Sequence, residues 1–290
     1  MERAPTPAAS LVIPAHNEST VLSRTLDGVL AQDVVAPLDV IVVPNGCSDD
    51  TAAVAAHFVE RAREQGWELR VSELSEGSKT AALNHGDSLA HSDTRIYMDA
   101  DVSISANTVS AVLDALDREG IHFAAPAMVP VPPESPLVRA YIDVWSQMPY
   151  VKQGGPGRGL YAVSPEGRSR WTEFPHITAD DTFVRLHFDR SEALIAEEAE
   201  VEVRFASSIS ELIAVRGRKF RGLDELRARY PSLMEQDEPR GRVAVRTIVD
   251  NPELWLRAPV FIAVYALGKL QLRRARRRGD DSWARADSSR

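Results

Sequence analysis

Short apolar runs alternate along the first half of the chain with longer segments whose apolar positions recur every three or four residues. The short runs predict buried strands, and they occupy residues 9–14, 38–43, 67–73 and 94–98. The longer segments predict amphipathic helices between them, and they occupy residues 17–32, 48–62 and 79–90. Regular alternation of strand and helix is typical of an α/β protein whose parallel, doubly wound sheet has right-handed crossovers.

Polar residues before the first two helices indicate where those helices begin. We expect Asn17 or Ser19 to cap the first helix and Ser48 to cap the second, with Asp49 and Asp50 in the first turn of the second. Each helix should pack one apolar side on the sheet. For the first these positions are Val21, Leu22, Thr25, Leu26, Val29 and Leu30, and for the second they are Ala52, Ala55, Ala56, Phe58, Val59 and Ala62.

The pattern loosens after residue 101. It predicts a helix at 107–119, a strand at 123–126, a proline-punctuated loop at 130–136, a glycine-rich stretch at 154–159, a strand at 160–163 and a helix at 182–188. The fold class is therefore α/β, a mostly parallel doubly wound sheet with α/β excursions in the second half and a C-terminal helix. We expect a disordered lead-in at 1–8, one main domain at 9–222 (halves 9–104 and 105–222) and a helical, basic tail at 223–290.

The C-terminal helix has an apolar centre at residues 258–268, well below the roughly 20 residues that span a bilayer. A cluster of arginines follows it, at Arg273, Arg274, Arg276, Arg277 and Arg278. Two interpretations stay open. The helix either contacts an anionic membrane surface, or it packs in the core and its basic end is solvated.

Composition narrows the class of protein. The 290 residues carry 34 basic and 42 acidic side chains, a formal net charge of −8, which argues against nucleic acid as a general partner. The single cysteine, Cys47, cannot form an internal disulfide, and the N-terminus lacks the pattern of a signal peptide. We therefore expect a cytoplasmic protein, with peripheral contact to the inner membrane face as the alternative.

Two carboxylates follow the strand at 94–98 directly, at Asp99 and Asp101. In open α/β sheets, ligands bind beyond the carboxyl ends of the strands. Paired carboxylates there suit Mg²⁺ or Mn²⁺, which completes its shell with water and substrate phosphates. Alone the pair is weak evidence, because acidic residues are common in turns after strands.

The other strand ends supply the context for this pair. Taken together, the motifs resemble those of the inverting family 2 glycosyltransferases, which have the GT-A fold. They are Pro14-Ala15-His16-Asn17-Glu18, Val43-Pro44-Asn45-Gly46-Cys47-Ser48-Asp49-Asp50-Thr51, Gly77-Ser78-Lys79-Thr80-Ala81-Ala82-Leu83-Asn84, Met98-Asp99-Ala100-Asp101 and Asp180-Asp181.

The resemblance implies transfer of a sugar from a nucleotide-diphosphate sugar, most simply a UDP-sugar, to an acceptor hydroxyl with inversion. Acceptors in the family include sugars, lipid-linked molecules and small molecules. By the same resemblance, the nucleotide sugar is bound by Pro14, Asn17, Glu18, Asn45, Asp49, Lys79, Asp99 and Arg218. Asn45 departs from the family's usual aspartate, which leaves a carbonyl acceptor but adds an amide donor and puts the identity of the base in question.

The resemblance also assigns the chemistry. Asp99 and Asp101 would hold the divalent cation, and Asp181, with Asp180 beside it, would be the general base. The basic segment 216–222 either closes over the diphosphate, with Phe220 in the aromatic position, or is a solvated turn. Aromatic side chains suited to stacking on a sugar, or to the core, are Trp145, Tyr150, Tyr161 and Trp171.

Three other classes of protein share parts of this pattern. A dinucleotide-dependent dehydrogenase would need a Gly-x-Gly-x-x-Gly turn after the first strand, and that turn is absent. A sugar nucleotidyltransferase shares the sheet and the metal pair but would want a basic, glycine-rich first loop. A non-catalytic nucleotide-sugar-binding or scaffolding subunit at the membrane would retain the fold. Within the glycosyltransferase reading, the resemblance places the reaction in cell-surface polysaccharide, glycolipid or specialised-metabolite assembly.

Overall fold

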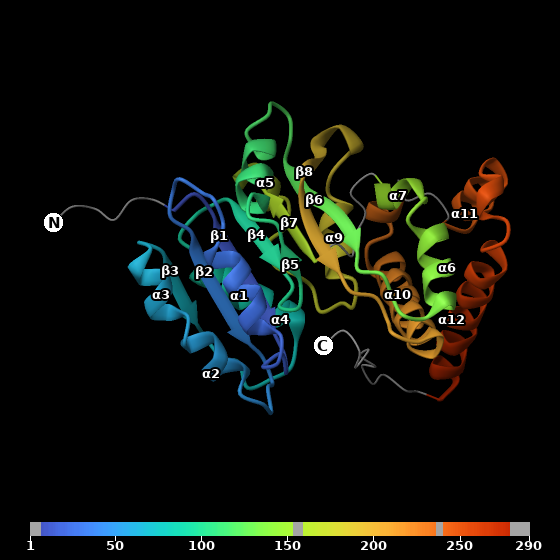
Figure 1. The fold of residues 1–290 in the computed structure, drawn as a ribbon, viewed down its shortest axis with the longest axis horizontal. Helices are drawn as coiled ribbons and strands as arrows, with labels where there is room; N and C mark the ends of the chain where they lie inside the picture. The colour runs from blue at the N-terminus through green and yellow to red at the C-terminus, as the bar shows by residue number, and fades with distance from the viewer. Residues whose placement is uncertain (1–6, 153–158, 236–239, 279–290) are drawn as a thin grey trace.

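A computed structural model describes residues 7–152, 159–235 and 240–278. Its centre is an eight-stranded mixed sheet in the order β3-β2-β1-β4-β7-β6-β8-β5 (Figure 1). Strands β1 (Ser10–Ala15), β2 (Asp39–Pro44), β3 (Glu68–Val71) and β4 (Arg95–Met98) are parallel, as their apolar runs predict. The mostly parallel α/β sheet is thereby confirmed.

The second half extends this sheet. Strand β7 (Leu160–Val163) lies antiparallel between β4 and β6 (Phe123–Pro130), and β8 (Ala193–Val203) pairs in parallel with β6. The short strand β5 (Ser103–Ile104) closes the edge against β8. The long strand β8 was not predicted, because acidic residues occupy many of its positions and hide the apolar pattern.

Helices cover both faces of the parallel part, which explains the continuous apolar strands. The covering helices are α1 (Leu22–Leu30), α2 (Thr51–Ala56), α3 (Val59–Glu64), α4 (Lys79–Leu89) and α5 (Thr108–Leu116). Successive β1 side chains alternate between two apolar clusters: Leu11 and Ile13 pack with Leu22 and Leu26, while Val12 packs with Leu83 of α4.

Several predicted helix starts are wrong. Helix α1 begins at Leu22 with no side-chain cap, because Asn17 has a φ of 55° and its side chain bonds to the neighbouring loop instead. Ser48 does not cap the second helix, which begins at Thr51 after Asp50 and breaks into α2 and α3. The break turns Ala56 and Val59 outward, while Ala55 and Ala62 stay buried.

A helical bundle stands at the far end of the sheet from β3 (Figure 1). It is built from α6 (Pro136–Trp145), α10 (Ile209–Arg229) and α12 (Ala258–Arg278), packed around Tyr141, Trp145, Leu212, Phe261 and Val264. The predicted C-terminal helix is confirmed. Smaller helices complete the second half: α7 (Pro149–Lys152), α8 (Pro165–Arg168), α9 (Asp180–Arg185) and α11 (Arg240–Asp250).

Predictions for loops, domain boundaries and terminal segments have different outcomes. The proline-punctuated loop predicted at 130–136 lies between β6, which ends at Pro130, and α6, which begins at Pro136 behind the cap Ser135. Helix α6 itself was not predicted. The predicted boundary at 222 falls inside α10, so the division into domains stays a prediction. Residues 1–6 of the predicted lead-in at 1–8, and residues 154–158 of the glycine-rich stretch at 154–159, lie outside the described residues. None of the helices in the described ranges is both long and apolar enough to cross a membrane.

Candidate active site

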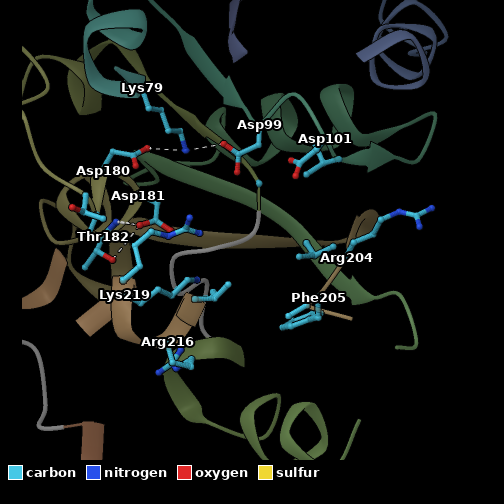
Figure 2. A pocket seen from close by; sticks show the side chains of 18 of the residues that line it. Lys79, Asp99, Asp101, Asp180, Asp181, Thr182, Arg204, Phe205, Arg216 and Lys219 are labelled. Carbon is cyan, nitrogen blue, oxygen red and sulfur yellow. Dashed lines mark hydrogen bonds and ion pairs between the residues drawn. The ribbon is translucent and has the colours of Figure 1, made fainter. Parts of the chain in front are cut away.

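A cavity of about 360 Å³ opens at the carboxyl ends of β1, β2 and β4. Acidic side chains from the sheet line one side of it, and basic side chains from α10 and its neighbours line the other (Figure 2). This is the edge of the sheet at which the sequence places Asp99 and Asp101, and both line the cavity.

Lys79 ties the two acidic motifs together. It is the first residue of α4, which Ser78 caps by accepting a hydrogen bond from the Ala81 N–H. Its Nζ lies 2.7 Å from Asp99 Oδ1 and 3.1 Å from Asp180 Oδ2 (Figure 2). Burial alone would lower the pKa of Lys79, but the charges of Asp180 and Asp99 outweigh it and raise the pKa well above its usual value. Lys79 is therefore a fixed cation between the two acidic motifs.

The donor set of Asp99 and Asp101 fits a divalent cation. Burial, and next the neighbouring charge of Asp99, raise the pKa of Asp101 to about 6. A bound cation stabilises the ionised form of a carboxylate in such surroundings. Hard oxygen donors at this position suit Mg²⁺ or Mn²⁺.

Asp180 and Asp181 open α9 and point to different partners. Asp180 is 6% exposed and pairs with Lys79, and burial raises its pKa although Lys79 opposes that shift. Asp181 Oδ1 accepts hydrogen bonds from the Thr182 N–H (2.6 Å) and Oγ1 (3.2 Å). Asp181 also lines the cavity. The pair thus divides into a buried partner of Lys79 and a carboxylate fixed at the cavity wall.

Asn45 is the most informative residue of the second loop. It is 2% exposed, and its Nδ2 donates to the Ala15 carbonyl (2.9 Å) and the Val43 carbonyl (3.3 Å). Its buried Oδ1 accepts no hydrogen bond from the described residues, yet Asn45 lines the cavity. The extra donor that separates asparagine from aspartate is consumed internally, so only a carbonyl acceptor is left for a ligand.

Gly46 lets two loops meet beside Asn45. Its φ is +55°, and a Cβ on it would lie 2.5 Å from the Gly77 nitrogen. Residues with a side chain are strained in that conformation and would also collide with the backbone. The loop after β2 therefore packs directly on the loop that precedes Lys79.

Of the remaining residues predicted to contact the nucleotide, two line the cavity and two stabilise the loops beside it. Pro14 and Glu18 line the cavity. Asn17 and Asp49 are absent from its lining and brace the loops instead, Asn17 Oδ1 accepting from the Ser48 N–H at 2.8 Å. Burial raises the pKa of Asp49, but hydrogen bonds from Thr51 and Ser19 outweigh it and hold that pKa at about 2.

The basic segment 216–222 lies inside α10, so the expectation of a solvated turn is wrong. Arg216 and Phe220 are each 5% exposed, and Gly217 packs against Gly268 of α12. Arg218 and Lys219 line the cavity. The segment is a rigid helical wall held by α12.

Sequence reasoning missed part of this wall. The cavity is also lined by Tyr141, Arg204, Phe205 and Arg240, which come from α6, the end of β8 and α11, elements that carried no motif. Of the candidate aromatics, Trp145 and Tyr150 line the cavity and Tyr161 lines a small one beside it. Trp171 packs in the core among phenylalanines.

A second acidic cluster lies at the opposite edge of the sheet, where β2 and β3 begin. Oxygen and nitrogen atoms of Asp39, Glu68 and His91 lie within 4.8 Å of one another. The Asp39 carboxylate already accepts from Ser10 Oγ (2.6 Å) and the His91 N–H (2.9 Å) and pairs with Arg70. These partners satisfy Asp39, so the cluster is far less suited to the cofactor than Asp99 and Asp101.

Carboxylates at the carboxyl edge of a mostly parallel α/β sheet agree with the GT-A fold that the motifs predict. The family model for glycosyl transferase family 2 matches residues 10–160, just over half of the chain, and the chain belongs to this family. The expected family and fold are both confirmed. A search of curated proteins found no significant match.

Solved structures share the fold at low sequence identity. The mannosyltransferase PcManGT from Pyrobaculum calidifontis, in complex with GDP-Man and Mn²⁺, is 18% identical with a TM-score of 0.59, covering 95% of this chain and 78% of that one. TarS residues 1–349 from S. aureus, with UDP, is 12% identical with a TM-score of 0.53 and coverages of 93% and 91%. Glucosyl-3-phosphoglycerate synthase from Mycobacterium tuberculosis, with Mn²⁺ and UDP-glucose, is 19% identical with a TM-score of 0.52 and coverages of 76% and 78%.

Proposed function

We propose that this glycosyltransferase moves a sugar from a nucleotide-diphosphate sugar to an acceptor hydroxyl, with inversion and with help from Mg²⁺ or Mn²⁺. One observation carries the proposal: Lys79 binds both Asp99 of the metal pair and Asp180 of the catalytic pair, in one cavity at the sheet edge. The groups proposed to act on the donor's leaving group and on the acceptor's proton therefore lie in one cavity, joined by Lys79. A non-catalytic subunit would not need this juxtaposition.

The donor base is proposed to lie against Asn45. A uracil or guanine ring presents an N–H donor, and the buried Oδ1 of Asn45 is an acceptor with no hydrogen bond from the described residues. Buried acceptors of this kind are costly unless a partner satisfies them. The related structures were solved with GDP-Man and with UDP, and a UDP-sugar is the donor proposed here.

Asp99 and Asp101 are proposed to hold the cation. When bound, the cation supplies positive charge that stabilises the departing diphosphate. Lys79 orients Asp99 and adds a further fixed positive charge beside it. The chain's own contribution is thus a preorganised set of charges, which costs no reorganisation during the reaction.

Asp181 is proposed as the general base. Sugar hydroxyls are poor nucleophiles at neutral pH, so a positioned carboxylate must accept the proton as the oxygen attacks. The bonds from Thr182 fix the Asp181 carboxylate at the cavity wall. Asp180 is paired with Lys79. Its proposed role is to position the Lys79 ammonium, and not to take the proton.

Slow hydrolysis of the donor tests the proposal without a known acceptor. UDP-, GDP- and dTDP-sugars are screened with Mn²⁺ by thermal shift, and release of nucleoside diphosphate is then measured for the stabilising donor. Asp99→Asn and Asp181→Asn should each lower release by about 100-fold or more, while the exposed Asp114→Asn should match wild type. Binding without turnover in wild type would favour a scaffolding subunit, and no binding at all would overturn the nucleotide site.

The C-terminal helix is further proposed to contact an anionic membrane surface. One side of α12 exposes Ile262, Leu267 and Leu270 and continues into exposed Arg273, Arg274 and Arg277. Nearby, Trp255 and Leu256 are 59% and 94% exposed. Apolar side chains flanked by arginines suit an interface of anionic lipid.

Point variants test this contact better than truncation, because Phe261 and Val264 of α12 are part of the core. Replacing Ile262 and Leu267 by glutamate should abolish co-sedimentation with phosphatidylglycerol vesicles. Val35→Glu, at the fully exposed position between α1 and β2, is the matched control. Wild-type protein that stays in the supernatant would refute membrane contact and leave the catalytic proposal untouched.

A further inference from the structure

The cavity is polarised, and Arg218 is the one residue of its basic half that the family resemblance assigns to the donor. Away from the sheet edge, its charged lining residues are all basic: Arg204, Arg216, Arg218, Lys219 and Arg240. Figure 2 shows Arg216 and Arg204 across the cavity from Lys79 and Asp99, with Lys219 next to Asp181 and Thr182. The acidic lining residues belong to the loops after β1 and β4 and to the start of α9.

Arg216 is a buried residue of this wall. Its guanidinium carbon lies 5.9 Å from the Tyr141 ring centroid and 5.3 Å from that of Phe220. The residue is 5% exposed, and its buried Nε has no hydrogen-bond partner among the described residues. A buried charge with an unsatisfied donor is costly, and an anion would offset that cost.

Lys219 faces the same space one helical turn further along. Burial lowers its pKa to about 8, and the charges of Arg216, Arg218 and Arg240 add to the shift while Asp181 opposes it. Several like charges around one cavity favour binding of an ion of the opposite sign. The charges of this wall therefore favour binding of an anion.

The position of the basic residues relative to Asp181 indicates which substrate carries the anion. If Asp181 takes the proton, the acceptor hydroxyl lies against Asp181, and the rest of the acceptor extends to the groups just beyond it. Those groups are Lys219 and Arg216. The donor diphosphate is instead expected beside Asp99 and Lys79.

We propose that this basic wall is the acceptor subsite, and that it takes an acceptor whose hydroxyl is close to a phosphate or carboxylate group. The inference rests on the proposed function and adds the substrate class to it. Arginine and lysine recognise such anions through charge-assisted hydrogen bonds. Tyr141, Trp145 and Phe205 supply the apolar walls that exclude water from those bonds.

Inorganic phosphate is the probe. Calorimetric titration is done on wild-type protein already saturated with Mg²⁺ and UDP, with sodium chloride at matched ionic strength as the blank. Phosphate should bind to this ternary complex. Lys219→Met and Arg218→Gln should each weaken phosphate about tenfold, Lys219→Arg should retain it, and the solvent-facing Arg227→Gln on the same helix should match wild type.

UDP affinity, measured separately, distinguishes the two anion sources. Under the proposal it stays at the wild-type value in Lys219→Met. If phosphate competes with UDP, and Lys219→Met weakens UDP, the wall serves the donor diphosphate and the acceptor assignment is overturned. UDP binding without any phosphate binding overturns the subsite alone, whereas failure of UDP itself to bind overturns the proposed function. Melting temperatures no lower than that of wild type in Lys219→Met and Arg218→Gln show that loss of folding is not the cause.

Discussion

Two lysines face the same cavity from opposite sides, and their surroundings separate the acidic sheet edge from the basic helical wall. Lys79 lies between Asp99 and Asp180, and the pKa of its ammonium is raised. Lys219 lies among arginines, and its pKa is lowered to about 8. Both are partly buried at the cavity, and the sign of the neighbouring charges decides the difference. At the sheet edge the lysine is paired with carboxylates, whereas the wall gathers several charges of one sign.

The two regions are also built differently. At the sheet edge some functional side chains follow their strand within a few residues, as Asp99 follows β4 and Asn45 follows β2, and others begin a helix, as Lys79 begins α4. In the wall the side chains come from α6, α10 and α11 and the end of β8, which packing brings together. Chemistry common to the family is thus encoded locally, and the part proposed to choose the acceptor depends on tertiary structure.

The largest effect is expected from Lys79→Met, which leaves the buried Asp180 carboxylate without its cation. Removing one partner of a buried ion pair costs about 3 kcal/mol of unfolding free energy. Urea unfolding at pH 7 measures it, with the exposed Lys152→Met as control. A loss within the error of the control would show that the sheet edge does not depend on this pair.

Lys219→Met should act in the opposite direction and raise the free energy of unfolding by about 2 kcal/mol at pH 7, because it removes a charge that burial and arginines disfavour. The folded pKa lies below the usual 10.5, so the unfolded chain binds more protons between about pH 8 and pH 10.5, and wild-type stability rises with pH across that window. The gain from the variant should therefore disappear by about pH 10.5. Phosphate-free buffers are required, and a variant less stable than wild type at pH 7 would contradict the polarised cavity.

This contrast also explains how much could be predicted from the sequence. The strands before Asp99 and Asn45 are apolar and short, so their ends could be located and their carboxyl edges assigned to a site. The predicted caps at Asn17 and Ser48 failed because these side chains bond across loops that meet only in the folded protein. Strand β8 and α10 were missed because charged residues interrupt their apolar pattern, and the roles of Arg204 and Arg240 were missed with them.

Asn45 offers a test of the sheet edge in the donor site. Asn45→Ala removes the buried acceptor and should weaken UDP about tenfold, the usual cost of losing such a bond. Asn45→Asp keeps the acceptor but gives up the bonds to the Ala15 and Val43 carbonyls. Those carbonyls would repel a carboxylate, so the variant should bind no better than wild type. Tighter UDP binding by Asn45→Asp would contradict the proposal that the Asn45 amide donates to the Ala15 and Val43 carbonyls and leaves only its oxygen for the base.

The smallest effect is expected where α12 holds the wall. A Cβ on Gly268 would lie 3.1 Å from Arg216 Cβ and 3.2 Å from the Phe220 ring, closer than most real contacts. Gly268→Ala should therefore cost about 1 kcal/mol of unfolding free energy, since overpacking exceeds the gain in helix propensity. Gly28→Ala in α1, where the new Cβ meets Ile104 at an ordinary 3.7 Å, should instead be neutral or stabilising. Because the displaced neighbours are Arg216 and Phe220, Gly268→Ala should also weaken phosphate more than UDP, and equal weakening of both would mean that the wall and the sheet edge are not independent.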